Sequence, residues 1–456
     1  MAMQQTARPG EWVETGVGYS DIDFDQYPLR ISTDRYTSPE WAARERELVW
    51  MRVWRFAGRE DELREPGDWK EYRIFDQSYV IVRGRDGQLR GFVNACRHRG
   101  NKLCTGGKGS VKRNFLCPYH LWSYDLTGEL KGVLRPECVG PIDMSENGLL
   151  AVSVDTFAGF IFLNPDPRAE PLAEFLGDAV ELLAPYHLEE MTPVMNVRET
   201  LDCNWKVVVD AFSEGYHIDG IHPELLRIIS IDPSRTRFNF FGDHSVAVAP
   251  FEVANVEGFG PEEQVEGIRE LPGTFPLVAE TLPKFEELVD AHRGPDGKLD
   301  LPEGVTPRTL LQQATRETLS AKGLDVSGLT DAQMSDNHGW LLFPNFFMTI
   351  RAGEATVILA EPHPDGDPNR CIWQIVAYMF LQPEHRDTWR AEPVEVEERG
   401  SYPYFLALQQ DYEQMPRQQA GLRNSALEHM TLARDEVVIA NFHKVLERHL
   451  RAGVAS

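Results

Sequence analysis

The sequence is poor in cysteine and in basic residues. Only 6 cysteines occur in 456 residues, at irregular spacing, far below the density of a disulfide-stabilised scaffold. Lys and Arg total 46 against 71 Asp and Glu, which gives a formal net charge of −25. Such a surface repels phosphate backbones and anionic lipid, so we do not expect nucleic-acid or membrane binding. It suits a basic protein partner, although a solvated acidic surface is the commoner explanation.

Hydrophobic runs of membrane-spanning length are also missing. No stretch approaches about 18 uncharged apolar residues, and the first residues lack the basic start and apolar centre of a signal peptide. We therefore expect a cytoplasmic location. In reducing surroundings, paired cysteines indicate a metal site more than a disulfide.

The length and texture of the chain predict more than one domain. A chain of 456 residues exceeds one domain of ordinary size. Residues 38–56 predict a helix, and residues 57–165 consist of short β runs divided by Gly and Asp. After residue 166 strands and helices are mixed, with a long Pro- and Gly-punctuated stretch at 255–335. This order favours an α+β protein over alternating βαβ units.

Two short motifs each combine a cysteine with a histidine. Cys96 and His98 form Cys-x-His, and Cys117 and His120 form Cys-x-x-His after a spacer of 18 residues. Two thiolates and two imidazoles can hold a [2Fe–2S] cluster with two Cys on one iron and two His on the other. A structural zinc site accepts the same residue types, but a zinc finger groups its Cys and its His separately. A chance arrangement of core residues is the third alternative.

A second set of ligand-type residues lies between positions 210 and 222. Asp210, Glu214 and His217 are spaced four and three apart, so on a helix they share one face. His222 precedes Pro223, which forces the helix to open or end there and lets the ring turn toward His217. Two His and one carboxylate form the facial triad of non-haem Fe(II) oxygenases. Glu214 is the nearest candidate carboxylate, but the third ligand can also come from elsewhere.

Both motifs resemble those of the Rieske-type ring-hydroxylating oxygenases, in the large subunit. In that family the second motif continues as Cys-Pro-Tyr-His-x-Trp-x-Tyr, which Trp122 and Tyr124 match. The resemblance implies that Tyr124 hydrogen-bonds near the cluster. Leu121 departs from the family pattern, which has Gly there. The family also places its metal-binding Asp far downstream, which identifies Asp411 as the third iron ligand beside His217 and His222.

Two further carboxylates, Glu214 and Asp210, have expected roles, of which only that of Glu214 comes from the resemblance. In the family a carboxylate three residues before the first His ligand links it to a Rieske His of the neighbouring subunit in a head-to-tail trimer, and Glu214 has that position. Asp210 is expected to support the helix or to hydrogen-bond a ligand. His429 and His443 are expected on the surface. The implied cofactors are a [2Fe–2S] cluster and a mononuclear Fe(II), with O2 as co-substrate.

The resemblance also implies the fold and the domain limits. We expect an N-terminal arm and helix at 1–56 that packs on the catalytic domain, and an all-β Rieske domain at 57–165. A helix-grip (Bet v1/START-like) catalytic domain with an antiparallel sheet follows at 166–456, with 255–335 as a variable lid or entrance. The substrate pocket is expected to be apolar, with the candidates Phe212, Phe343, Asn345, Phe346, Phe347 and Phe405.

The implied function is that of a terminal oxygenase component. Electrons come from NAD(P)H through a reductase and possibly a ferredoxin, and the foremost expectation is cis-dihydroxylation of an aromatic substrate. The alternative is a Rieske monooxygenase that performs monohydroxylation or O- or N-dealkylation. More remote alternatives are a Rieske electron-transfer protein and a zinc-containing ligand-binding protein. The implied assembly is an α3 homotrimer, or an α3β3 hexamer with a small subunit.

Overall fold

The structure is a computed structural model that describes residues 16–230, 232–251, 259–273, 275 and 277–452. The chain folds into two compact units, each with its own core. The smaller unit comprises residues 43–175 with 364–366, and the larger comprises the remaining residues. We call them the Rieske unit and the catalytic unit, after the sequence motifs that they contain.

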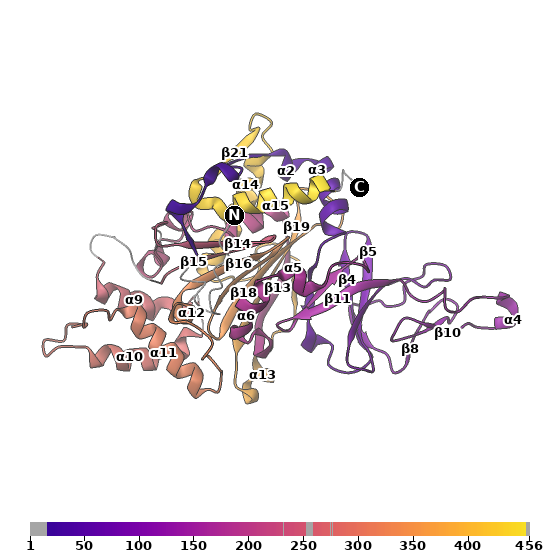
Figure 1. The fold of residues 1–456 in the computed structure, drawn as a ribbon, viewed down its shortest axis with the longest axis horizontal. Helices are drawn as coiled ribbons and strands as arrows, with labels where there is room; N and C mark the ends of the chain where they lie inside the picture. Colours follow the sequence, from indigo (N-terminus) through magenta and orange to yellow (C-terminus); the bar gives the residue numbers. More distant parts are fainter. Residues whose placement is uncertain (1–15, 231, 252–258, 274, 276, 453–456) are drawn as a thin grey trace. The chain divides into compact units, whose positions relative to one another are not determined.

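The Rieske unit is built from two antiparallel sheets (Figure 1). Its core joins the large sheet, through Trp69 and Val80, to the buried Cys96, Cys117 and Tyr124. The seven-stranded sheet has the order β3 (Arg55–Arg59), β12 (Phe160–Asn164), β11 (Ala151–Phe157), β6 (Leu89–Val93), β5 (Gln77–Arg83), β4 (Asp68–Ile74) and β7 (Lys108–Ser110), and the three-stranded sheet has the order β10 (Leu130–Gly132), β9 (Ser123–Asp125) and β8 (Asn114–Leu116).

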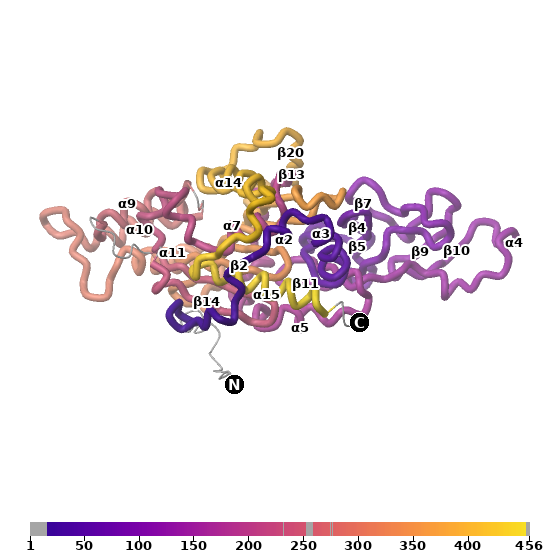
Figure 2. The backbone as a smooth tube through the Cα atoms, turned by 90° about the horizontal axis from the view of Figure 1, so that it is seen from above, coloured from indigo at the N-terminus to yellow at the C-terminus, as the bar shows by residue number. Residues whose placement is uncertain are grey.

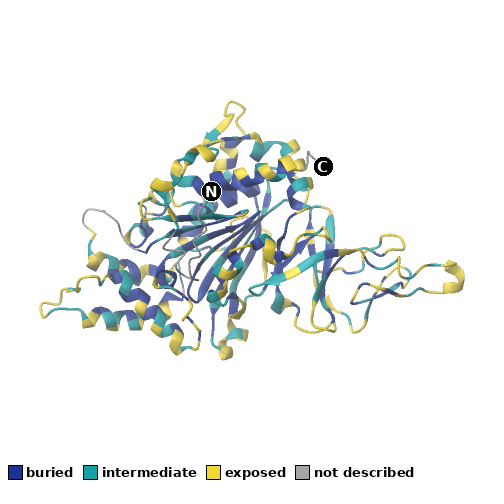
Figure 3. Cartoon of the chain, in the orientation of Figure 1, coloured by how far each residue is buried: buried dark blue, intermediate teal, exposed yellow. Residues whose placement is uncertain are grey.

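The catalytic unit is organised around one nine-stranded sheet. Neighbouring strands are antiparallel except for β13 and β20, which pair in parallel. The sheet order is β1 (Val17–Gly18), β14 (Arg237–Phe241), β15 (His244–Ala249), β16 (Asn337–Leu342), β17 (Phe346–Arg351), β18 (Glu354–Pro362), β19 (Cys371–Phe380), β13 (Met191–Leu201) and β20 (Val394–Val396). Figure 3 shows its central strands largely buried.

Three helices pack on this sheet or on one another. α7 (Trp205–Phe212) contacts β18 and β19, α14 (Leu406–Leu422) contacts α7, and α15 (Val437–Ala452) contacts β15. Figure 2 shows α14 near α7 and near α2 (Asp34–Thr37), and α14 contacts both helices. α7 begins at Trp205 because the Asn204 side chain accepts a hydrogen bond from the Lys206 backbone N–H.

A second group of helices comes from the stretch 255–335, of which residues 255–258, 274 and 276 lie outside the described residues. Thr306 caps α11, and Pro307 occupies its first position. The outward sides of α10 and α11 are exposed (Figure 3), while their inner sides share one hydrophobic cluster. The helices of this group are α9 (Pro261–Glu270), α10 (Val278–Ala291), α11 (Pro307–Ala321) and α12 (Asp331–Ser335).

The predicted α+β class is confirmed, with one all-β unit and one mixed unit. The helix predicted at 38–56 is shorter, because α3 (Pro39–Glu45) continues only as a wider turn at Arg46–Trp50 before β3 begins at Arg55. Among the described residues, no helix combines the length and the apolarity needed to cross a membrane.

Candidate metal centres

The two Cys-His motifs of the Rieske unit form loops with the same backbone pattern. In the first loop Cys96 donates its N–H to Asn101 O (2.8 Å), and its own carbonyl accepts from Gly100 N–H (2.9 Å). In the second loop Cys117 donates to Trp122 O (2.8 Å) and accepts from Leu121 N–H (2.9 Å). Each pattern therefore joins a cysteine to the residues four and five positions later.

This repeated geometry shows why glycine is the usual residue at position 121 and what the leucine there costs. The equivalent residue of the first loop is Gly100, with φ +74°, and Leu121 itself has φ +58°. Both residues are in the left-handed region, where glycine is unstrained and a leucine costs about 1–2 kcal/mol. Glycine is therefore the natural residue here, and Leu121 keeps the loop shape at an energetic cost.

The four candidate ligands converge between these loops. Both cysteines are buried, and the His98 and His120 rings lie with centroids 4.6 Å apart. His98 also stacks on Trp122 at 4.9 Å. The buried Nδ1 of His120 has no hydrogen-bond partner among the described residues, which fits an imidazole whose partner is a metal. Two thiols and two imidazoles are the donor set of a Rieske cluster.

Tyr124 anchors the first of these loops. Its hydroxyl lies 3.2 Å from Cys96 Sγ and accepts a hydrogen bond from the Arg97 backbone N–H at 3.0 Å. Burial is the main factor that raises the pKa of the Cys96 thiol. A thiolate at this position therefore depends on a neighbouring cation and on the hydroxyl of Tyr124.

In the catalytic unit the predicted helical face does not form. α7 ends at Phe212, so Glu214 and His217 lie in the turn between α7 and α8 (Ile218–Ile221), and only Asp210 is on the helix. The Ser213 hydroxyl donates to Val209 O at 2.6 Å, which helps to close the last turn. As Pro223 predicts, His222 leaves the α region, with φ −121° and ψ 54°.

His217, His222 and Asp411 nevertheless come together. Their ligand atoms all lie within 4.8 Å of one another. Asp411 Oδ1 is 3.0 Å from His222 Nε2 and 3.6 Å from His217 Nε2. Asp411 comes from α14, 189 positions after His222. The set has the composition of a two-His, one-carboxylate iron site.

The other ring nitrogen of each histidine has its own acceptor. His217 Nδ1 lies 2.5 Å from Glu214 Oε1, and His222 Nδ1 lies 2.7 Å from Gln410 Oε1. A carboxylate or amide oxygen at Nδ1 holds the proton there and leaves the Nε2 lone pair for a metal. Sequence reasoning missed Gln410, whose position directly before Asp411 was the available signal.

Asp210 belongs to a separate buried group. Tyr36 donates to Asp210 Oδ2 at 2.5 Å and lies 2.7 Å from His443 Nε2. The prediction of His443 as a surface residue is wrong, because its side chain is fully buried on α15. Burial also lowers the pKa of His443 and favours its neutral form. His429, in contrast, is exposed. Asp210 thus joins α7 to the N-terminal segment and to α15.

The candidate pocket residues lie in different surroundings. The Phe212 ring is 6.0 Å from the Phe347 ring, and Phe346 is buried. Phe405 packs against the hydrophobic cluster that contains the inner residues of α9, α10 and α11. Phe343 stacks on His449 at 4.8 Å, and Asn345 donates to Ala360 O. The catalytic unit has a cavity of about 40 Å³ whose wall contains none of these six residues. Its wall includes Phe251, Phe275, Thr349, Arg351, Glu354 and Ala377.

Two family models match the chain. The catalytic domain of the ring hydroxylating alpha subunit matches residues 186–452, and the Rieske [2Fe-2S] domain matches residues 53–146. The first covers more than half of the chain, and the two matched ranges contain both candidate metal centres. The cofactors of this family are a [2Fe–2S] cluster in the Rieske domain and a mononuclear iron in the catalytic domain.

Curated relatives match over part of their length. The chain is 34 % identical over 192 residues to the glycine betaine monooxygenase oxygenase subunit of Chromohalobacter salexigens, which covers 42 % of each protein. It is 29 % identical over 283 residues to the 2-aminobenzenesulfonate 2,3-dioxygenase alpha subunit of Alcaligenes sp., over 61 % of this chain and 71 % of that protein. The chain thus spans less than half of the first of these relatives.

Solved structures share the fold over almost the whole chain. A quaternary ammonium Rieske monooxygenase in complex with L-carnitine aligns with a TM-score of 0.62 at 19 % identity, over 92 % of this chain and 95 % of the other. Naphthalene 1,2-dioxygenase bound to phenanthrene aligns with a TM-score of 0.64 at 19 % identity, over 95 % of both chains. The chain belongs to the family of Rieske-type ring-hydroxylating oxygenase alpha subunits.

Proposed function

We propose that this chain is the terminal oxygenase component of a Rieske non-haem iron system. The observation that carries the proposal is the convergence of His217, His222 and Asp411, with ligand atoms within 4.8 Å. We assign these residues to a mononuclear Fe(II), and Cys96, His98, Cys117 and His120 to the [2Fe–2S] cluster. When bound, the iron supplies dioxygen activation and the cluster supplies single electrons.

The residues around the iron ligands have positioning roles in this proposal. Glu214 and Gln410 accept from the two Nδ1 atoms and fix the rings with Nε2 toward Asp411. Because Glu214 is at the position of the family's bridging carboxylate, we infer that it also links His217 to the cluster domain of a neighbouring subunit. That role requires a trimer, either α3 or α3β3, and a reductase or ferredoxin as electron donor.

For the substrate, the alternative prediction of a monooxygenase now has more support than aromatic cis-dihydroxylation. Several relatives are named for the oxidation of glycine betaine or carnitine. One relative is named as a dioxygenase of an aromatic sulfonate. We propose a quaternary ammonium compound as substrate, with monohydroxylation or N-dealkylation as the reaction. The aromatic reading is the second candidate.

Labelled dioxygen distinguishes these functions. The purified chain is supplied with a reductase, NADH and ¹⁸O2, and offered glycine betaine, carnitine, naphthalene and 2-aminobenzenesulfonate separately. A monooxygenase incorporates one ¹⁸O atom into product and reduces the other to water. Two ¹⁸O atoms on adjacent ring carbons favour the dioxygenase. Absence of substrate-dependent oxygen uptake with all four compounds, while the cluster is reducible, contradicts the proposed quaternary ammonium substrate.

A further inference from the structure

Glu199 is a buried carboxylate of the catalytic unit that is not a candidate metal ligand. It lies on β13 of the sheet and is 3 % exposed. No Lys, Arg or His among the described residues forms an ion pair with it. Burial of a carboxylate is costly unless hydrogen-bond donors surround it, so its donors show which segments of the chain it holds.

Three donors to Glu199 come from one stretch of the chain, residues 400–412. Glu199 Oε1 accepts from the Gly400 backbone N–H at 2.9 Å and from the Tyr412 hydroxyl at 2.7 Å. Oε2 accepts from the Tyr404 hydroxyl at 3.0 Å. Burial, together with the Glu199 carboxylate, raises the pKa of both hydroxyls, that of Tyr412 to about 12. Both tyrosines therefore stay protonated at neutral pH and act as donors.

Tyr412 directly follows two residues of the candidate iron site on α14. Gln410 Oε1 lies 2.7 Å from His222 Nδ1, and Asp411 Oδ1 lies 3.0 Å from His222 Nε2. Successive residues of a helix point about 100° apart. The hydrogen bond from Tyr412 to Glu199 therefore fixes the angle at which the two preceding side chains leave the helix.

The rotation of α14 about its own axis matters on the scale of a metal–ligand bond. A side-chain tip lies about 5 Å from the axis of a helix, so a rotation of about 10° displaces that tip by about 1 Å. Ligand distances in metal sites vary by only about 0.2 Å. A contact that limits the rotation of α14 therefore acts directly on the affinity for Fe(II).

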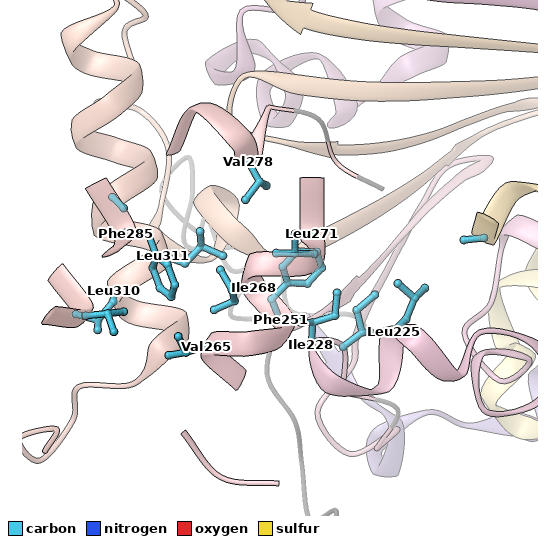
Figure 4. Close-up of a cluster of buried hydrophobic side chains, with 14 residues drawn as sticks. Leu225, Ile228, Phe251, Val265, Ile268, Leu271, Val278, Phe285, Leu310 and Leu311 are labelled. Carbon is cyan, nitrogen blue, oxygen red and sulfur yellow. The ribbon is translucent and has the colours of Figure 1, made fainter. Parts of the chain in front are cut away.

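The other contacts of α14 fix this rotation less well near Asp411. Phe405 and Ala407 pack with the hydrophobic cluster shown in Figure 4, and apolar packing is not directional. Hydrogen bonds, in contrast, require alignment of donor and acceptor.

A second directional contact of α14 lies beyond a break in its hydrogen bonds. Gln419 Oε1 accepts from the Asn204 backbone N–H at 3.0 Å. Between Gln419 and Tyr412 lies Pro416, which has no N–H to donate to the Tyr412 carbonyl. The half of α14 that carries Asp411 therefore depends on its own directional contact, which Tyr412 supplies.

The aromatic surroundings of Tyr412 extend to the other segment of the iron site. Trp373 is the cross-strand neighbour of Glu199 on β19. Its ring centroid lies 5.8 Å from that of Tyr412 and 5.9 Å from that of Phe212. Phe212 ends α7, two residues before Glu214. One buried ring of the sheet therefore contacts both segments that carry the iron site.

We propose that Glu199 is a positioning residue of the iron site, which through Tyr412 fixes the rotation of α14 and with it the placement of Asp411. The proposal rests on the proposed function, because it requires a metal bound at Asp411. The competing explanation is a purely structural carboxylate that stabilises residues 400–412 as a whole. That explanation predicts iron affinities that change only in parallel with the stability of the protein.

Two matched variants separate these explanations. Tyr404→Phe and Tyr412→Phe each remove one hydroxyl that donates to Glu199 and keep the aromatic ring, but only Tyr412 adjoins Asp411. The full chain with its cluster intact is titrated anaerobically with Fe(II) in competition with an Fe(II)-binding dye, and the melting temperature of each variant is recorded. The two variants should lose similar stability, because each loses one hydrogen bond to the same carboxylate.

The iron affinities of these two variants should differ. Tyr412→Phe should raise the Fe(II) dissociation constant about tenfold, the lower end of the effect of losing an outer partner of a metal site. Tyr404→Phe should change it less than about twofold, because the lost hydroxyl lies on the loop before α14.

A double variant assigns the effect to the link between the two residues. Glu199→Gln leaves one acceptor oxygen for three donors and should weaken Fe(II) binding at least about tenfold. The double variant Glu199→Gln/Tyr412→Phe should bind no more weakly than Glu199→Gln alone, because both changes break the same hydrogen bond. Fully additive losses would mean that the two residues act independently, which overturns the proposal.

Two further results overturn the proposal while leaving the proposed function in place. One is a Tyr412→Phe variant that binds Fe(II) as tightly as wild type. The other is an equal loss of affinity in Tyr404→Phe and Tyr412→Phe, which indicates a general effect of stability. Failure of the proposed function looks different, because wild type would then bind no Fe(II) beyond the iron of its cluster.

Discussion

In the Rieske unit the four candidate ligands lie between positions 96 and 120, whereas in the catalytic unit Asp411 lies 189 positions after His222. The two sites also differ in exposure. His98 is exposed at the tip of its loop, while His222 is 2 % exposed and Asp411 is 7 % exposed. A cluster that exchanges electrons with other proteins gains from ligands near the surface. A site that activates dioxygen gains from exclusion of water.

The comparison also concerns how each site holds its ligands. In the Rieske unit two backbone loops with the same hydrogen-bond pattern present the side chains. In the catalytic unit the ligands are oriented by neighbouring side chains, because Glu214 and Gln410 hydrogen-bond to the two imidazoles. The first site should therefore be sensitive to backbone conformation, and the second to changes of neighbouring polar side chains.

The largest effect should follow from removal of a cluster ligand. In Cys96→Ser the cluster should be lost, so that iron falls from about three to about one per chain and turnover disappears. Metal analysis and the visible spectrum measure this. Cys104→Ser removes a buried cysteine that is not a proposed ligand and should retain the cluster. If wild type and Cys96→Ser contain the same amount of iron per chain, Cys96 is not a cluster ligand.

The next largest effect should come from Glu214→Gln. Both metals and their spectra should be retained, while turnover falls about 10–100-fold because His217 loses its charged partner and the link to the neighbouring cluster. Steady-state turnover with EPR of both sites measures this change. Glu413→Gln, an exposed residue on the same helix as Asp411, is the matched control. Near-normal turnover in Glu214→Gln would exclude the bridging role.

A moderate effect on the cluster potential is expected from Tyr124→Phe. With the proposed cluster bound, we expect the hydroxyl 3.2 Å from Cys96 Sγ to stabilise its more negative, reduced state. Loss of about 1 kcal/mol of this interaction lowers the potential by about 40 mV for one electron. Spectroelectrochemistry measures the shift. Tyr119→Phe removes an exposed hydroxyl and should leave the cluster potential unchanged. An unchanged or higher potential in Tyr124→Phe would contradict the role assigned to the Tyr124 hydroxyl.

The smallest effect is a gain in stability from Leu121→Gly. Relief of the left-handed leucine should raise the free energy of unfolding by about 1 kcal/mol, measured by thermal bleaching of the cluster absorbance. Leu116→Gly, also exposed but in strand β8, should lower stability instead. If Leu121→Gly destabilises the protein, the leucine side chain contributes more by its contacts than it costs by its backbone angle.

The local parts of this architecture could be predicted from sequence, and the non-local parts only through a resemblance. Cys96, His98, Cys117 and His120 form a readable pattern because their loops are short. Pro223 correctly marks the end of α8 before His222. Asp411 has no local signal, because its proximity to His222 arises only when α14 packs on α7.

The failures have physical causes in local hydrogen bonding and in tertiary packing. The spacing of Asp210, Glu214 and His217 suits a helix, yet the helix ends at Phe212, where Ser213 bonds back to Val209. His443 is in a polar sequence, but Tyr36 and Asp210 supply its buried partners from distant segments. The cavity wall combines β17–β19 with Phe251 and Phe275, so no contiguous aromatic motif identifies it.

Iron content in Asp411→Ala, beside wild type, tests the two-site account most directly. The account predicts about three irons per chain in wild type and about two in the variant, with the Rieske spectrum unchanged in both. An Asp411→Ala variant that keeps all of its iron, or a wild type with only the two irons of the cluster after reconstitution with Fe(II), would contradict the assignment of His217, His222 and Asp411 as a metal centre.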